Sequence, residues 1–240
     1  LNLARDLGID RTFITGDPDK GWKISRFISD SRNLDASRPD ELEQAMRMDR
    51  SLHESGTALS RNFDFITEGI KYERILKQYG PIDVPGYDEL REKVLRLKEL
   101  ADADGFAKAP SHNDFFPLNF LVDSTGHLDL IDWEYAGMAD PMIDIAMAAI
   151  YSYMDFEEAR NLLREYLHAD PEGAKSSPDQ PDREEELYPL VAAYMGLGGL
   201  LWALWCCYKI SLGEKFGDYS LKMYRYFKDS LRILQNLGKF

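Results

Sequence analysis

Apolar side chains recur at helical spacing in two stretches of the chain. In residues 39–53 and in residues 87–103 they fall three or four positions apart, which gathers them on one face of a helix. Asp140 followed by Pro141 marks another helix start, because aspartate caps free N–H groups and proline fits the first turn. The pattern therefore predicts helices at these three places.

Short runs of β-branched and aromatic residues predict strands. Residues 12–15 and 22–28 flank a stretch rich in glycine, aspartate and proline, so they are expected to pair as a hairpin. A second hairpin is expected where residues 120–122 and 127–131 flank the turn at 123–126.

The most apolar segment is 190–208, which contains no charged residue. Its length just reaches that of a helix that spans a bilayer. Glycines, tryptophans and a cysteine pair lower its hydrophobicity, and no other segment supports a membrane location, so a buried helix is the better interpretation. The preceding residues 171–189 contain prolines and the acidic run Glu184 to Glu186, and are expected to form a solvated acidic connection at the surface.

Charge and composition exclude several classes of function. The 240 residues carry 29 Lys and Arg against 42 Asp and Glu, a formal net charge of −13, so nucleic acid is not an expected partner. The two cysteines are adjacent and cannot easily bridge each other, which favours a reducing compartment, the cytoplasm. The four histidines are scattered, so any metal is expected to bind through oxygen.

Candidate chemistry is concentrated between residues 112 and 132. Asn119 enters the second hairpin and Asp132 leaves it, so antiparallel pairing places their oxygens together, where two hard ligands suit Mg²⁺. Asp114, five residues before Asn119, is placed to accept a proton from a substrate hydroxyl, and His112 is interpreted as a packed residue that braces the loop. Each residue alone has an ordinary explanation as a turn former, a cap or a packed histidine. The ordered combination indicates phosphoryl transfer.

At this point the sequence resembles a known family. Residues 112–119 and 130–135 are similar to the catalytic and metal-binding segments of the choline/ethanolamine kinases, relatives of the aminoglycoside phosphotransferases with a protein-kinase-like fold. The similarity continues through residues 140–146, 201–205 and 216–219. It is greatest to the bacterial choline kinases of the phosphocholine-decoration pathway.

The resemblance implies roles for the residues of the candidate site. Asp114 would be the catalytic base, Asn119 and Asp132 would bind Mg²⁺, and Glu134 would lie close to the metal. Asp144 would brace the catalytic loop, although a carboxylate in the first turn of a helix is an equally good explanation for it.

The resemblance also implies the fold class and its division. The expected fold is α+β and protein-kinase-like: residues 31–240 form a mainly helical C-terminal lobe with a catalytic β-hairpin, and residues 1–30 are a remnant of the N-terminal β lobe with the hinge. Residues 190–240 would form a helical segment of the substrate pocket. The strand from residue 25 onward would enter the hinge, whose backbone meets the adenine of the co-substrate ATP through Arg26, Phe27 and Ile28.

The residue types support a choline pocket independently. A quaternary ammonium has no N–H to donate, so aromatic faces recognise it, each contributing about 0.5–2 kcal/mol. Trp202 and Trp205 are three residues apart and share a helix face. Such an aromatic pair is more often core than ligand cage. The resemblance favours the cage, formed by Trp202 and Trp205 with Tyr135 and Tyr219.

Two departures from the family pattern stand out. Tyr151 occupies a position where related choline kinases carry a carboxylate, for which Asp155 or Glu157 could substitute. The phosphate-covering loop, lysine and helix glutamate of the N-terminal lobe have no counterpart in the sequence. Residues 1–8 read like the end of a helix, so the chain is expected to begin inside the glutamate-bearing helix and to show weak or no turnover.

The predicted function is choline kinase activity, the Mg²⁺-dependent transfer of the ATP γ-phosphate to the hydroxyl of choline. An ethanolamine kinase and an aminoglycoside-type phosphotransferase are the alternatives within the enzyme class. A non-catalytic choline-binding fragment is the alternative outside it. The expected partners are ATP and a small amino-alcohol, without nucleic acid or a membrane span.

Overall fold

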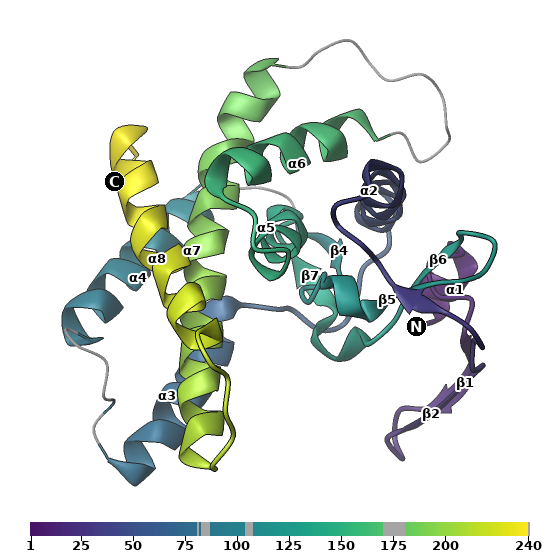
Figure 1. The fold of residues 1–240 in the computed structure, drawn as a ribbon, viewed down its shortest axis with the longest axis horizontal. Coiled ribbons are helices and arrows are strands. Elements are labelled where there is room, and N and C mark those ends of the chain that lie inside the picture. The colour runs from purple at the N-terminus through teal and green to yellow at the C-terminus, as the bar shows by residue number, and fades with distance from the viewer. Residues whose placement is uncertain (81, 83–86, 104–107, 170–180, 240) are drawn as a thin grey trace.

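The structure is a computed structural model that describes residues 1–240 except 81, 83–86, 104–107, 170–180 and 240. Helices dominate, and the strands lie near the N-terminal part of the molecule (Figure 1). The helices are α1 (Asn2–Asp6), α2 (Pro39–His53), α3 (Phe65–Tyr79), α4 (Tyr87–Ala103), α5 (Met142–Tyr151), α6 (Phe156–His168), α7 (Pro181–Ser211) and α8 (Tyr219–Asn236), with 3₁₀ turns η1 (Pro117–Asn119) and η2 (Trp133–Tyr135).

The strands form small antiparallel sheets. They are β1 (Phe13–Asp17), β2 (Trp22–Ser25), β3 (Arg32–Asn33), β4 (Ala109–Ser111), β5 (Phe120–Val122), β6 (Leu128–Leu130) and β7 (Gly137–Ala139). β1 pairs with β2, β4 pairs with β7, and β5 lies between β3 and β6. The β5–β6 hairpin pairs Phe120 with Leu130, which confirms the second predicted hairpin.

The two amphipathic helices predicted from apolar spacing are confirmed as α2 and α4, with the expected bounds. The first predicted hairpin is present as β1 and β2, but the strand expected to run to Ile28 ends at Ser25. β1 begins at Phe13, and Arg26 makes the last pairing bond, from its N–H to the carbonyl of Thr12 at 2.7 Å. Phe27 and Ile28 therefore lie beyond the reach of the partner strand.

Helix α7 is the centre of the helical lobe. It contacts α3, α4, α5, α6 and α8, and Figure 1 shows α8 lying alongside it. It is the one helix among the described residues that is long and apolar enough to cross a membrane by length and composition. However, 89% of its most apolar window is buried inside the molecule, so the prediction of a buried helix at 190–208 is confirmed.

The close packing of α7 on α8 depends on a glycine. A Cβ at Gly199 would lie 2.5 Å from the carbonyl oxygen of Met223 on α8, closer than real side chains approach backbone atoms. A residue with a side chain at this position would therefore force the two helices apart.

The acidic connection predicted at 171–189 is wrong for its last part. Residues 171–180 lie outside the described residues, but α7 already begins at Pro181. Proline is accepted in the first turn of a helix, so Pro181 begins α7 instead of interrupting it. Glu184 is only 12% exposed and pairs with Arg160 and Arg164 of α6. The acidic run thus docks α7 on α6.

Candidate active site

The loop that carries Asp114 follows β4 and is held by a buried histidine. His112 is fully buried, and its Nε2 lies 3.0 Å from the carbonyl oxygen of Ile131, at the end of the β5–β6 hairpin. Its Nδ1 accepts from the N–H of Asp114 at 3.3 Å. His112 therefore links the loop to the hairpin, which is the bracing contact expected from the sequence.

Asp144, in the first turn of α5, holds the same loop through hydrogen bonds to its backbone. Its two carboxylate oxygens accept the backbone N–H groups of His112 and Asn113 at 2.8 and 2.6 Å. Asn113 has a left-handed backbone with φ of 65°, so the loop turns sharply at this point. Burial acts to raise the pKa of Asp144, but the interactions with His53 and the backbone outweigh it, and the pKa is lowered.

Both carboxylate oxygens of Asp114 are held by donors. The hydroxyl of Tyr151 donates to Oδ1 at 2.7 Å, and the side-chain amide of Asn119 donates to Oδ2 at 3.0 Å. The same amide nitrogen lies 2.9 Å from the carbonyl oxygen of Asp114. The carboxylate is therefore oriented by two side chains from different elements, η1 and α5, as a base that must face a substrate hydroxyl requires.

The carboxylate of Asp114 has two acidic neighbours, Asp132 and Glu134. Asp132 follows β6 with a left-handed backbone, φ of 67°, and its side chain is exposed. The pKa of Glu134 is raised, first by partial burial and then by the negative charges of Asp132 and Asp114. Because like charges repel, this arrangement favours a cation between them.

The donor set fits Mg²⁺. The N–H of Ile131 donates to the backbone carbonyl of Asn119 at 2.8 Å, so Asn119 and Asp132 start and end the same hairpin side by side. The Nδ2 of Asn119 is committed to Asp114, which leaves the amide oxygen as the end of the side chain that can bind a metal. Carboxylate and amide oxygens are hard ligands of the kind that Mg²⁺ prefers.

The hairpin is anchored from its outer side by the N-terminal segment. Arg11 pairs with buried Asp129 of β6 at 2.7 Å and with Asp123 of the turn at 3.1 Å. The N–H of Leu130 donates to the carbonyl of Ile9 at 2.9 Å. These contacts keep the two predicted metal ligands in register.

A continuous set of aromatic rings leads from Asp114 to α8. Trp202 lies at its centre, with ring centroids 6.0 Å from Tyr135, 5.8 Å from Tyr151 and 5.9 Å from Trp205. We call this set the aromatic cluster; its members are Phe116, Tyr135, Tyr151, Trp202, Trp205, Phe216 and Tyr219.

Trp202 also carries an unsatisfied polar group. Its indole N–H is buried and has no hydrogen-bond partner among the described residues. Leaving a buried donor without a partner costs about 1–3 kcal/mol. Unpaired buried donors of this kind are therefore rare in an ordinary core and call for an explanation such as a functional role.

The structure brings most of the predicted site residues together, but not all. The nucleotide-binding prediction falls on the loop after β2, where Phe27 is 89% exposed. Asp155, a candidate for the missing carboxylate, caps α6 by accepting from the N–H groups of Glu157 and Glu158, each at 2.9 Å. Phe116 and Phe216 were not predicted as members of the cluster, and Tyr151 was identified only as a departure from the family pattern.

The comparison with known families decides the classification. A sequence model described as "Phosphotransferase enzyme family" matches residues 11–183. The chain belongs to this family. The match includes the loop of Asp114, the β5–β6 hairpin and Asp144.

Within the phosphotransferase family, the chain is similar to proteins named LicA. It is 28% identical over 211 residues to Protein LicA of Haemophilus influenzae, covering 86% of this chain and 60% of that protein. The chain thus spans less than two-thirds of that relative's length.

Two solved structures are similar as well. The choline kinase LicA from Streptococcus pneumoniae aligns with a TM-score of 0.74 and 28% identity, over 100% of this chain and 78% of that one. A LicA in complex with AMP aligns with a TM-score of 0.77 and 28% identity, over 99% and 77%. The protein-kinase-like fold and the resemblance to choline kinases expected from the sequence are therefore confirmed.

Proposed function

We propose that this phosphotransferase-family chain carries the acceptor and metal sites of an ATP-dependent choline kinase. The observation that carries the proposal is the aromatic cluster, which ends at the carboxylate of Asp114 through the 2.7 Å hydrogen bond from Tyr151. A cage of ring faces suits a quaternary ammonium, and a carboxylate at its edge suits the hydroxyl of the same small molecule. The LicA relatives, one of them a choline kinase, support the same assignment.

The chain's own residues account for the acceptor side of the reaction. Trp202, Trp205 and Tyr135 would hold the trimethylammonium group, with Tyr219 closing the cage from α8. Asp114, held by its two donors, would accept the hydroxyl proton as the oxygen attacks the γ-phosphorus.

Mg²⁺ would be held by Asn119 and Asp132 with Glu134 nearby, and when bound it supplies neutralisation of phosphate charge. ATP would meet the backbone around Arg26, Phe27 and Ile28. A LicA complexed with AMP supports nucleotide binding by a chain of this fold. The adjacent cysteines Cys206 and Cys207 fit a reducing compartment, and we propose a cytoplasmic location.

Binding and turnover test the proposal separately. Calorimetry on this chain should detect choline binding that is weakened in Trp205→Ala. An ADP-release assay with choline, ethanolamine and kanamycin should rank choline first. Preference for kanamycin would contradict the choline assignment, and choline binding without ATP binding or turnover would indicate a non-catalytic binding protein.

A further inference from the structure

A buried carboxyl group that the proposed reaction does not use lies beneath the catalytic loop. Asp49 on α2 is fully buried, and neither of its carboxyl oxygens has a complete hydrogen bond among the described residues. One polar neighbour is His53, one turn later on the same helix, whose Nε2 lies 3.2 Å from Oδ1 of Asp49.

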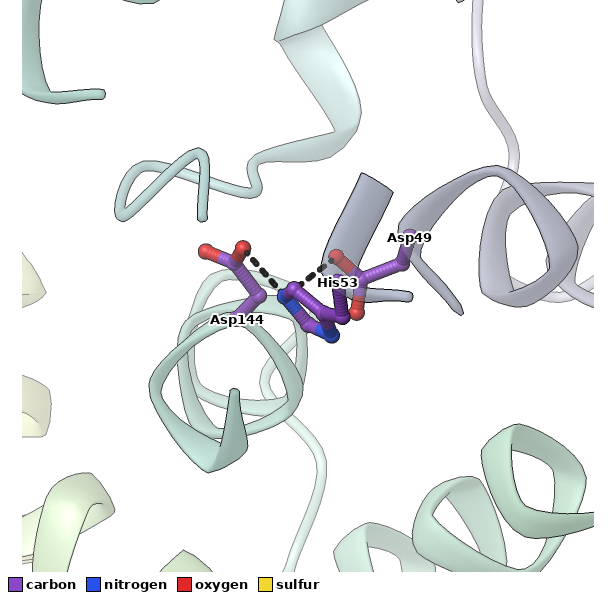
Figure 2. A group of neighbouring side chains, drawn as sticks. All are labelled: Asp49, His53 and Asp144. Atoms are coloured by element: carbon purple, nitrogen blue, oxygen red, sulfur yellow. Dashed lines mark hydrogen bonds and ion pairs between the residues drawn. The ribbon is translucent and has the colours of Figure 1, made fainter. Parts of the chain in front are cut away.

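The same nitrogen of His53 also faces Asp144. Nε2 lies 3.2 Å from Oδ2 of Asp144, and Figure 2 shows the two carboxyl groups reaching this one ring nitrogen from opposite sides. The candidate ligand atoms of Asp49, His53 and Asp144 all lie within 4.8 Å of one another. Two carboxyl groups therefore compete for a single N–H. Asp144 is the better acceptor of this N–H, because two backbone N–H groups already orient its carboxylate.

The charges around the cluster do not neutralise a second carboxylate. The other ring nitrogen of His53, Nδ1, lies 2.9 Å from the hydroxyl oxygen of Tyr166 on α6. This hydroxyl can donate or accept a hydrogen bond. Arg50 on α2 donates to Glu54 and to the carbonyls of Leu167 and Ala169 instead. His112 acts on Asp144, where its charge helps to lower the pKa of that carboxyl group.

An ionised carboxylate in a dry site without a donor is very unfavourable, and such a group normally takes up a proton. We propose that Asp49 is a carboxylic acid that keeps its proton in the folded protein. This proton lets His53 and Asp144 hold the loop of Asp114 in place.

Asp49 is therefore a positioning residue that acts through His53 and Asp144. Burial first, and the nearby charge of Asp144 second, raise the pKa of Asp49 well above its usual range, in agreement with this arrangement. Loss of the proton would place a second negative charge beside Asp144. The carboxylate of Asp144 accepts hydrogen bonds from the backbone N–H groups of His112 and Asn113. The effect on catalysis rests on the proposed function, but the protonation of Asp49 does not.

Proton uptake on folding gives a test that needs no activity. A group with a raised pKa in the folded state stabilises the fold least at high pH, because folding must then take up a proton. Asp49→Asn has nearly the same shape and needs no proton. The unfolding midpoint of Asp49→Asn minus that of the wild type should therefore become steadily more positive from about pH 5 to about pH 8.

The matched control is Glu43→Gln on the exposed face of the same helix, for which the difference should not change in this way. A flat or falling difference for Asp49→Asn would overturn the proposal. In infrared spectra, the wild type at neutral pH should show the carbonyl band of a protonated carboxyl group that Asp49→Asn lacks. The absence of this band would overturn it as well.

A metal ion is the competing occupant of the cluster. If Zn²⁺ or Mn²⁺ raises the unfolding midpoint of the wild type but not of Asp49→Asn, the cluster binds a cation, and the proposal is wrong. An equal response of both proteins supports the protonated acid.

The positioning role is tested by kinetics. In the ADP-release assay, Asp49→Ala should lower kcat about tenfold with little change in KM for choline, since Asp49 does not touch the aromatic cluster. Asp49→Asn should restore most of the loss. An equal loss in both variants, or an effect on KM alone, would contradict the positioning role. If the chain neither binds choline nor phosphorylates any acceptor, the proposed function fails, while the unfolding and infrared results still decide the protonation of Asp49.

Discussion

The hydroxyl of Tyr151 donates a 2.7 Å hydrogen bond to Oδ1 of Asp114, from α5 to the catalytic loop. Tyr151 is buried, and burial followed by the charge of Asp114 raises the pKa of its hydroxyl well above the usual range. The tyrosine therefore stays protonated and remains a donor at neutral pH. It occupies the position where a carboxylate was expected from the family pattern, so the residue that faces Asp114 here is neutral.

Tyr151→Phe should lower kcat by about tenfold, because a hydrogen bond to a charged group is worth about 1.5–3 kcal/mol and the variant loses one of the two donors that orient Asp114. Steady-state ADP release measures the effect. Tyr153→Phe is the matched control, since Tyr153 lies two residues after Tyr151 and is 52% exposed. Unchanged kcat in Tyr151→Phe would show that Asn119 alone is sufficient to orient the base.

Trp205→Ala should weaken choline binding by about twofold to thirtyfold, because one aromatic face contributes about 0.5–2 kcal/mol to a quaternary ammonium. Trp205 is only half-buried, so this variant tests the cage with less loss of core packing than a change at Trp202. Calorimetric titration with choline measures the effect, and Trp22→Ala on the exposed face of β2 is the control. Equal affinities of the two variants would mean that Trp205 belongs to the core and not to a ligand cage.

Gly199→Ala should lower the free energy of unfolding by about 1–3 kcal/mol, because the added methyl group would overlap the backbone of α8 at Met223. Chemical denaturation measures the change. Gly69→Ala on α3 is the matched control: its nearest neighbour would be a side-chain carbon at 3.8 Å, so alanine should stabilise this helix by up to about 1 kcal/mol. Effects of the same sign at the two glycines would contradict this account of the α7–α8 contact.

Glu41 on α2 should contribute to stability in a pH-dependent way. Hydrogen bonds from Arg32, against the opposing effect of burial, lower the pKa of Glu41 to about 2. Its contribution is therefore fully present above about pH 4.5 and is lost as the pH falls towards 2.

Thermal unfolding of the wild type and Glu41→Gln over this range measures the contribution of Glu41. The advantage of the wild type in unfolding midpoint should shrink as the pH falls. An advantage that stays constant through acid pH would show that the ion pair with Arg32 is not formed in solution.

The sequence predicted the parts of the molecule whose signals are local. α2 and α4 each bury one amphipathic face, and the β5–β6 hairpin is marked by its turn residues, so their bounds follow from spacing. Helix α3 was not predicted, although Asp64 caps it by accepting from the N–H of Thr67 at 2.7 Å. Its cap is a sequence signal that could have identified the helix.

The remaining features depend on contacts between distant segments. Tyr151 meets Asp114 from 37 positions away, and Glu184 pairs with arginines on α6. Asp49 reads as an ordinary polar residue of an amphipathic helix, and only the packing of α2 on the catalytic loop and α5 turns it into a buried acid. No local pattern records which helix faces meet, so the sequence could suggest Asp114, Asn119 and Asp132 as candidate site residues, with His112 and Asp144 as supports, but not the contacts of Tyr151 and Asp49.

The position of α7 has a consequence for how acceptor preference can change in evolution. The helix that carries Trp202 and Trp205 is also the one on which five other helices pack. Substitutions there alter recognition and global stability together, so few of them are accessible to a marginally stable protein. Phe216, in the loop before α8, and Tyr219, in the first turn of α8, belong to the same cluster, and substitutions there should cost less stability. Relatives that have diverged towards new amino-alcohols should therefore differ first at the Phe216–Tyr219 end and keep the tryptophans of α7.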